Sequence, residues 1–203
     1  HERDKIKEWF KKDVSVWDNR SISIGWENTI VSSVKTASNR WVEGLSIKEI
    51  AQRRNVDPVD AMCDLLLDEE LAVTQINFYG CEENVGIYMK CPVTMICTDG
   101  IYGGRPHPRL FGSFPRVLGR YVREEQLLTL EEAIYKMTTL PADTFGLRHR
   151  GRIAEGYAAD LVVFAPDAVA DKATFEQPEQ YPEGIMYVAV NGKIVIEEGH
   201  FTG

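Results

Sequence analysis

The sequence predicts an α/β protein, and two observations support that fold class. From residue 72 to residue 140, segments with strand-like patterns alternate with segments that have helical patterns. One strand-like segment, residues 93–97, is apolar at every position except Thr94, which is typical of a strand buried on both faces of a sheet. Alternation of this kind indicates βα units packed on a parallel sheet.

The composition limits the possible kinds of protein. With 203 residues, 44% of them hydrophobic, the chain can bury one core, or one core and a small appendage. A net charge of -8 without a compensating stripe of Lys and Arg predicts no nucleic-acid partner. No apolar run approaches the roughly 20 residues of a membrane helix. The charged residues 1–20 do not resemble a signal peptide, so we expect no membrane association.

The cysteines indicate the compartment. Cys63, Cys81, Cys91 and Cys97 form no C-x-x-C pair and have no histidine at zinc-finger spacing. All but Cys81 lie in or beside apolar segments, where a reduced cysteine acts as a small buried hydrophobe. We therefore expect thiols in the core of a cytoplasmic protein.

The N-terminal region predicts one helix followed by strands. Ile6, Trp9 and Phe10 have the i, i+3, i+4 spacing of a helix face. Val14–Trp17 and Ser21–Val34 are rich in β-branched residues and predict strands.

Residues 46–70 predict two helices with distinct start signals. Ser46 and Glu49 form the S-x-x-E pattern of a capping box at the first helix. Asp57 and Pro58 suit the N-cap and the first position of the second helix.

The alternating region follows. Its predicted elements are a strand over Ala72–Tyr79, a helix over Glu82–Lys90, the strand at 93–97, a loop over 99–113, and helices over Pro115–Arg123 and Leu130–Thr138. Thr129 and Glu132 repeat the capping-box pattern before the last of these helices.

The last fifty residues predict a small antiparallel β element. Asp160–Phe164 has the pattern of a strand, and Ile185–Val190 and Lys193–Glu197 predict a hairpin. The intervening Asn191-Gly192 suits a type I′ turn. Residues 166–184 predict an irregular surface connection.

Asp99 is the first candidate for chemistry because it follows the apolar segment 93–97 directly. In a (β/α) barrel, side chains at the carboxyl ends of the strands converge on the active site. A carboxylate there could bind a metal or move a proton. The alternative is a plain Asp-Gly turn, which local sequence alone favours.

The loop after Asp99 offers two more candidates, His107 and Arg109. Pro106 and Pro108 stiffen the backbone around them. An arginine presents a planar fork that matches a carboxylate, so the loop could hold a small anionic substrate. The alternative is a solvated surface loop. Two other histidines, His149 and His200, are expected to be exposed.

Several motifs from about residue 40 onward are shared with a known family. They are Ile96–Gly100, Pro106–Arg109, Gly112–Tyr121, Leu130–Ala133, Met137–Ala142, Gly151–Phe164, Tyr181–Ile185 and Val190–Gly192. On these residues the sequence resembles the D-aminoacylases, the N-acyl-D-amino-acid deacylases of the amidohydrolase superfamily.

The resemblance implies the C-terminal part of a distorted TIM-like, metal-dependent hydrolase barrel with strands of a small flanking β-sandwich. Residues 1–80 would form a barrel connection and an inserted α+β subdomain. Residues 81–148 would form the last barrel βα unit with the active-site loop, and 149–203 the sandwich strands.

The resemblance also implies roles for individual residues. Asp99 would be the catalytic acid and base and would lie at a zinc site. Arg109 would bind the carboxylate of an N-acyl-D-amino acid, with His107 in the same motif. Either Phe78 or Tyr79 would border the substrate.

The sequence departs from the family's pattern in its metal ligands. The family's H-x-H and its further Cys and His ligands are absent, and zinc usually needs three protein ligands. We therefore expect an incomplete metal site with Asp99, tight zinc binding only in a longer enzyme, and no activity of this chain alone. We also expect the chain to associate with a second copy or with its missing half. Two alternatives are part of an amidohydrolase acting on a cyclic amide and a non-catalytic α+β domain that binds small anions or protein.

Overall fold

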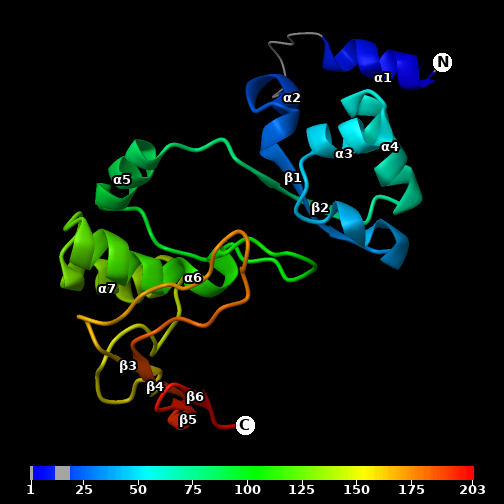
Figure 1. Cartoon of the computed structure of the whole chain (residues 1–203). Coiled ribbons are helices and arrows are strands. Elements are labelled where there is room, and N and C mark those ends of the chain that lie inside the picture. The colour runs from blue at the N-terminus through cyan, green and yellow to red at the C-terminus, as the bar shows by residue number, and fades with distance from the viewer. Residues whose placement is uncertain (1, 12–18) are drawn as a thin grey trace. The chain divides into compact units, whose positions relative to one another are not determined.

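The computed structural model describes residues 2–11 and 19–203 (Figure 1). The chain divides into two compact units. The first unit comprises His1–Gly80 and Ile101–His107, and the second comprises Cys81–Gly100 and Pro108–Gly203. Among the described residues, no helix is long and apolar enough to span a membrane.

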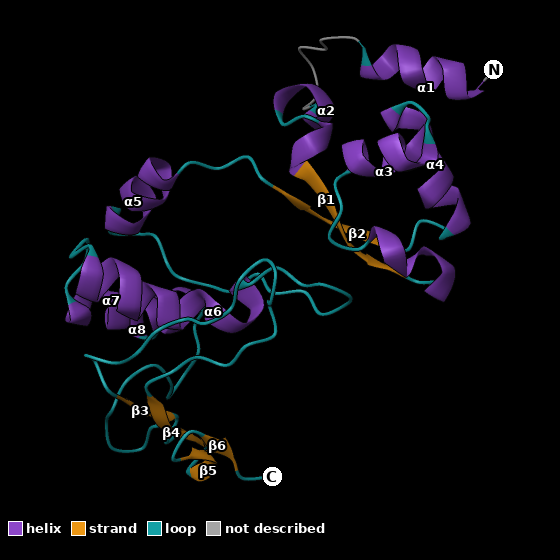
Figure 2. Cartoon of the chain, in the orientation of Figure 1, coloured by secondary structure: helices purple, strands orange, loops and turns teal. Residues whose placement is uncertain are grey.

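The first unit packs helices around a two-stranded sheet (Figure 2). Its elements are α1 (Glu2–Phe10), α2 (Arg20–Ser23), η1 (Trp26–Asn28), β1 (Thr29–Val34), η2 (Ala37–Val42), α3 (Ile47–Arg54), α4 (Pro58–Asp68) and β2 (Val73–Asn77). β1 and β2 are antiparallel.

The prediction of a strand over Ser21–Val34 is correct only for β1. Its first half forms α2 and η1, because the β-branched residues that favour a strand are concentrated after Asn28. The strand predicted at Val14–Trp17 lies outside the described residues.

Both predicted helix starts in the first unit are confirmed. The Ser46 hydroxyl accepts a hydrogen bond from the Glu49 amide, and the Glu49 carboxylate accepts one from the Ser46 amide. Asp57 Oδ1 accepts a hydrogen bond from the Val59 amide at 2.9 Å, with Pro58 at the first helical position. The core beneath these helices consists of Val31, Val42, Ile47, Ile50, Ala51, Ala61 and Leu65.

A buried carboxylate, Glu69, organises the loop after β1. Its oxygens accept hydrogen bonds from the amides of Lys35 and Thr36 at 2.6 and 2.8 Å, from Asn39 Nδ2 at 2.6 Å, and from the Thr36 hydroxyl. Burial by itself would raise the pKa of Glu69, but these donors lower it to about 2. The carboxylate thus accepts the hydrogen bonds that the amides of Lys35 and Thr36 would otherwise give to water.

The second unit joins a helical layer to a four-stranded sheet. Its elements are α5 (Glu82–Lys90), α6 (Arg109–Arg116), the π-helix η3 (Val117–Glu124), α7 (Leu130–Met137), α8 (Thr139–Thr144), β3 (Leu161–Phe164), β4 (Ile185–Val190), β5 (Lys193–Glu197) and β6 (His200–Phe201). The capping box of Thr129 and Glu132 is confirmed at the start of α7.

The predicted hairpin is confirmed as β4 and β5. Asn191 and Gly192 have φ values of 49° and 79°, and a type I′ turn needs positive φ at both positions. Asp160 Oδ1 accepts a hydrogen bond from the Asn191 amide at 2.8 Å, which ties the turn to the start of β3.

Residues 166–184 are irregular, as predicted, but they are not only a surface connection. Val169 and Ala173 are buried, and Val169 belongs to the core of the second unit. An isolated antiparallel bridge joins Ala170 to Glu183. The segment therefore folds back over the helical layer and supplies part of its core.

The prediction of a strand at residues 93–97 is wrong for this structure. The segment has no ladder partner, because both sheets in the described part of the chain are antiparallel and neither includes it. The expected parallel sheet is therefore not present among these residues. Cys97 is exposed rather than buried in a core, since one side of the segment has no cover.

Candidate functional site

Asp99 lies in a sharp turn at the end of the 93–97 segment. Its φ of 44° is in the left-handed region, and the Thr98 hydroxyl accepts a hydrogen bond from the Gly100 amide at 3.3 Å. A Cβ at Gly100 would come within 2.6 Å of Leu110 Cδ1 and 3.1 Å of Leu110 Cα. Glycine at position 100 therefore lets α6 approach the turn closely.

Arg109 is the first residue of α6 and forms an ion pair with Asp99. Its Nη2 lies 2.7 Å from Asp99 Oδ2, and the Asp99 side chain is 73% exposed. An exposed pair of this kind contributes about 0–1 kcal/mol, so a carboxylate from solution could replace Asp99 on the guanidinium at little cost. The pair thus combines an anion-binding fork with a carboxylate that can become free.

Arg109 is held at the amino end of a well-anchored helix. The Ser113 hydroxyl donates to the Arg109 carbonyl at 2.8 Å. Further along α6, Arg116 Nη1 donates to Asp171 Oδ2 at 2.9 Å, which fixes the helix to the irregular 166–184 segment. Gly112 and Pro115 form the buried face of the helix.

The loop between Asp99 and Arg109, residues 101–107, belongs to the first unit and carries His107. The Arg105 amide donates to the Ser32 carbonyl, and the Ser32 hydroxyl donates to the Arg105 carbonyl, each at 2.7 Å. Pro106 is buried and His107 is half-buried. The structure therefore brings Asp99 and Arg109 together within the second unit and places His107 with the first.

Phe78 and Tyr79 follow β2 in the first unit. The Phe78 amide donates to the Asn28 carbonyl at 3.0 Å, and the side chains are 41% and 72% exposed. Both rings are thus available at a surface. His149 and His200 lie in the second unit and are exposed.

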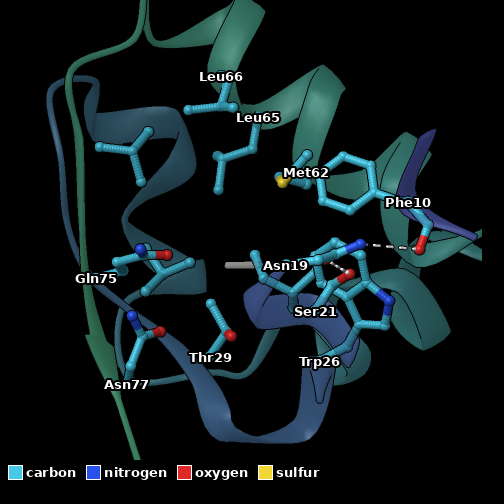
Figure 3. A pocket seen from close by; sticks show the side chains of 13 residues that line it. Phe10, Asn19, Ser21, Trp26, Thr29, Met62, Leu65, Leu66, Gln75 and Asn77 are labelled. Carbon is cyan, nitrogen blue, oxygen red and sulfur yellow. Dashed lines mark hydrogen bonds between the residues drawn. The ribbon is translucent and has the colours of Figure 1, made fainter. Parts of the chain in front are cut away.

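A cavity of about 420 Å³ lies beside β2 in the first unit (Figure 3). Met62, Leu65 and Leu66 line one side, and Gln75 and Asn77 extend from β2 on another. Asn77 Oδ1 is buried without a hydrogen-bond partner in the described part of the chain. Nothing local in the sequence marks the Asn77 oxygen as buried.

The described residues do not complete a metal centre. Within residues 2–11 and 19–203, no three His, Cys, Asp or Glu side chains lie close enough together to hold a metal ion. Asp99 supplies one carboxylate, and its near neighbour in the structure is the cation of Arg109. The donors among the described residues therefore do not fit a zinc site by themselves.

Comparison with known proteins places these residues in a family. The model of the amidohydrolase family matches residues 42–196. The D-aminoacylase of Alcaligenes xylosoxydans is 44% identical over 163 residues, which is 80% of this chain and 33% of that protein. The chain thus spans about a third of the length of this relative.

Solved structures agree with the sequence match. A structure from a study of the binuclear metal center in D-aminoacylase has a TM-score of 0.81 and 41% identity, over 90% of this chain and 37% of that one. The N-acyl-D-glutamate deacylase from Bordetella bronchiseptica, complexed with zinc and a phosphonate inhibitor, has a TM-score of 0.79 and 40% identity, over 87% and 35%. The α/β fold class and the resemblance to D-aminoacylases are confirmed, and the chain belongs to the amidohydrolase family.

Proposed function

We propose that this chain supplies the proton-transfer and carboxylate-binding residues of a zinc-dependent N-acyl-D-amino-acid deacylase. The observation that carries the proposal is the 2.7 Å pair of Asp99 and Arg109. The match to D-aminoacylase over 80% of the chain supports the reaction class.

In this proposal Arg109 binds the α-carboxylate of the substrate through two parallel hydrogen bonds. The substrate takes over the guanidinium and releases Asp99. Asp99 then accepts the proton of the attacking water and passes it to the leaving amine, first as base and then as acid. The exposure of the Asp99 side chain, at 73%, leaves room for the water and the amide.

His107 and one of Phe78 and Tyr79 would border the substrate. The remaining metal ligands would come from protein outside this chain, because the described residues contain no ligand cluster. We therefore propose that the chain works as the C-terminal part of a longer hydrolase. The three segments 1–80, 81–148 and 149–203 stay part of this proposal.

We expect the chain alone to be inactive and to associate with a second copy or with the rest of the enzyme. The four-stranded sheet supports association, because Val162, Val163 and Phe201 are 56%, 46% and 75% exposed. Such an apolar surface favours a covering layer. Sedimentation of the purified chain tests this point, and a monomer at all concentrations would contradict it.

A chimera tests the proposed reaction. Residues 42–196 replace the matching part of the Alcaligenes xylosoxydans D-aminoacylase, and hydrolysis of N-acetyl-D-amino acids is measured with zinc present. We expect turnover, and none from the isolated 203-residue chain. A folded, zinc-loaded chimera that binds substrate without turnover would refute the proposal. Turnover of a cyclic amide alone would favour the alternative amidohydrolase, and a chimera without either activity would favour a binding domain.

A further inference from the structure

Lys136, on α7, is a buried cation that the proposed reaction does not use. It is 5% exposed, although lysine is rarely buried without a partner. Its Nζ donates to the carbonyl of Cys91 at 2.6 Å and to the carbonyl of Thr94 at 3.1 Å. Both acceptors are backbone atoms of the segment that leads to Asp99.

A second contact joins the same two segments through the backbone. The Ile96 amide donates to the Lys136 carbonyl at 3.2 Å. Lys136 therefore binds the segment at three positions, with its side chain at Cys91 and Thr94 and its main chain at Ile96. Ile96 itself packs against the core of the second unit, which includes Ala133 of α7.

These contacts matter because residues 93–97 have no strand partner among the described residues. A chain without ladder hydrogen bonds needs other groups to satisfy its carbonyls and fix its path. Asp99 follows Ile96 by three residues, and its turn is closed by the local Thr98 hydrogen bond and by the pair with Arg109. On the N-terminal side of Asp99, Lys136 anchors the segment through its contacts with Cys91, Thr94 and Ile96.

We propose that Lys136 is a positioning residue that fixes the backbone path from Cys91 to Ile96 and thereby the place of Asp99. A hydrophobic residue of similar volume would avoid the desolvation of an ammonium group but would leave the Thr94 carbonyl without this donor. The choice of lysine over methionine therefore suits a role in ordering the segment rather than in filling the core. The catalytic consequence rests on the proposed function of Asp99, whereas the ordering of the segment does not.

Hydrogen exchange on the 203-residue chain tests the ordering. We expect Lys136→Met to speed exchange of the Ile96 amide about tenfold. The variant keeps the main-chain acceptor of that amide but loses the side-chain hydrogen bonds to Cys91 and Thr94, which loosens the segment by about the contribution of one hydrogen bond. Lys136→Arg, which keeps a cationic donor, should restore most of the protection. Lys90→Met is the matched control, because Lys90 is exposed on α5 in the same unit. Unchanged Ile96 exchange in a folded Lys136→Met chain would overturn the proposal, and Lys136→Gln serves the same test if the methionine variant does not fold.

Kinetics of the chimera test the positioning of Asp99. A displacement of a catalytic group by about 1 Å can cost about 100-fold in rate, so kcat should fall by up to that factor in Lys136→Met. The KM should change little, because Arg109 is anchored by α6 rather than by this segment. Faster exchange with an unchanged kcat would refute the link to Asp99. Asp99→Asn, measured alongside, separates this outcome from failure of the proposed reaction itself, because it tests the carboxylate without altering Lys136.

Discussion

Substituting Gly104 by alanine tests how the loop that carries His107 docks on the first unit. Gly104 has a φ of 48°, and a Cβ there would lie 2.4 Å from Ser33 Cβ and 2.5 Å from the Ser32 carbonyl oxygen. Neither neighbour can move without shifting β1. We therefore expect the loop to leave the strand, which breaks the two hydrogen bonds between Ser32 and Arg105.

The magnitude follows from two contributions. A left-handed conformation costs a residue with a Cβ about 1–2 kcal/mol. Two lost hydrogen bonds add about 1–3 kcal/mol. Asn55→Ala is the matched control, because Asn55 is exposed in the same unit and has a left-handed conformation, with a φ of 53° close to the 48° of Gly104. The difference between the two variants is thus expected to be about 1–3 kcal/mol in the free energy of unfolding.

Urea unfolding followed by tryptophan fluorescence measures this difference. All four tryptophans lie between residues 9 and 41, so the signal reports the first unit. Equal destabilisation by Gly104→Ala and Asn55→Ala would refute the docking argument, because it would leave only the cost of the left-handed backbone.

Three further substitutions test the site and the buried carboxylate. Asp99→Asn in the chimera should lower kcat by at least about 100-fold without loss of stability, and a tenth or more of the parental rate would contradict the role of Asp99. Arg109→Lys should weaken binding of substrates with a free carboxylate by about 1–3 kcal/mol, whereas equal losses for esterified substrates would exclude a carboxylate fork. Glu69 stabilises the fold as a carboxylate, since its pKa is lowered from 4.5 to about 2, so its contribution is complete above pH 4.5 and is lost as the pH falls toward 2. Glu69→Gln should remove that part of the pH dependence in urea unfolding, and an unchanged profile would argue against the role.

Local signals in the sequence predict much of this fold. The capping boxes at Ser46 and Thr129 and the Asn191-Gly192 turn each depend on residues within a few positions, and the structure confirms all three. Such signals work because one side chain satisfies a nearby backbone group whatever the rest of the chain does.

Features that depend on partners distant in the sequence are harder to predict. The apolar pattern of 93–97 describes a strand's side chains, but a strand also needs a neighbour for its backbone, and the described residues offer none. The burial of Glu69 has no local sign, because it is the middle residue of the acidic run Asp68–Glu70, which is typical of a solvated surface. Lys136 could have been found, since it lies three residues after Ala133 on the buried face of α7.

Candidate site residues show the same division. Asp99 and Arg109 stand out in the sequence through their place after an apolar segment and within a proline-stiffened loop, and the structure pairs them. The docking of the intervening loop on Ser32 has no local sign, because Ser32 is more than seventy residues away along the chain. The role of each residue in a reaction stays a prediction.

The division of the chain into two units limits how the protein can be truncated or recombined. The polypeptide passes between the units three times, after residues 80, 100 and 107, so the first unit is built from two separate stretches. A cut after Gly80 would therefore yield an N-terminal piece without the 101–107 loop, which forms hydrogen bonds to Ser32 through Arg105. A deletion of 101–107 would remove part of one unit while joining Gly100 directly to Pro108 in the other. Neither unit can be exchanged between homologues as a single continuous cassette, and recombination within this region must transfer both stretches of the first unit together.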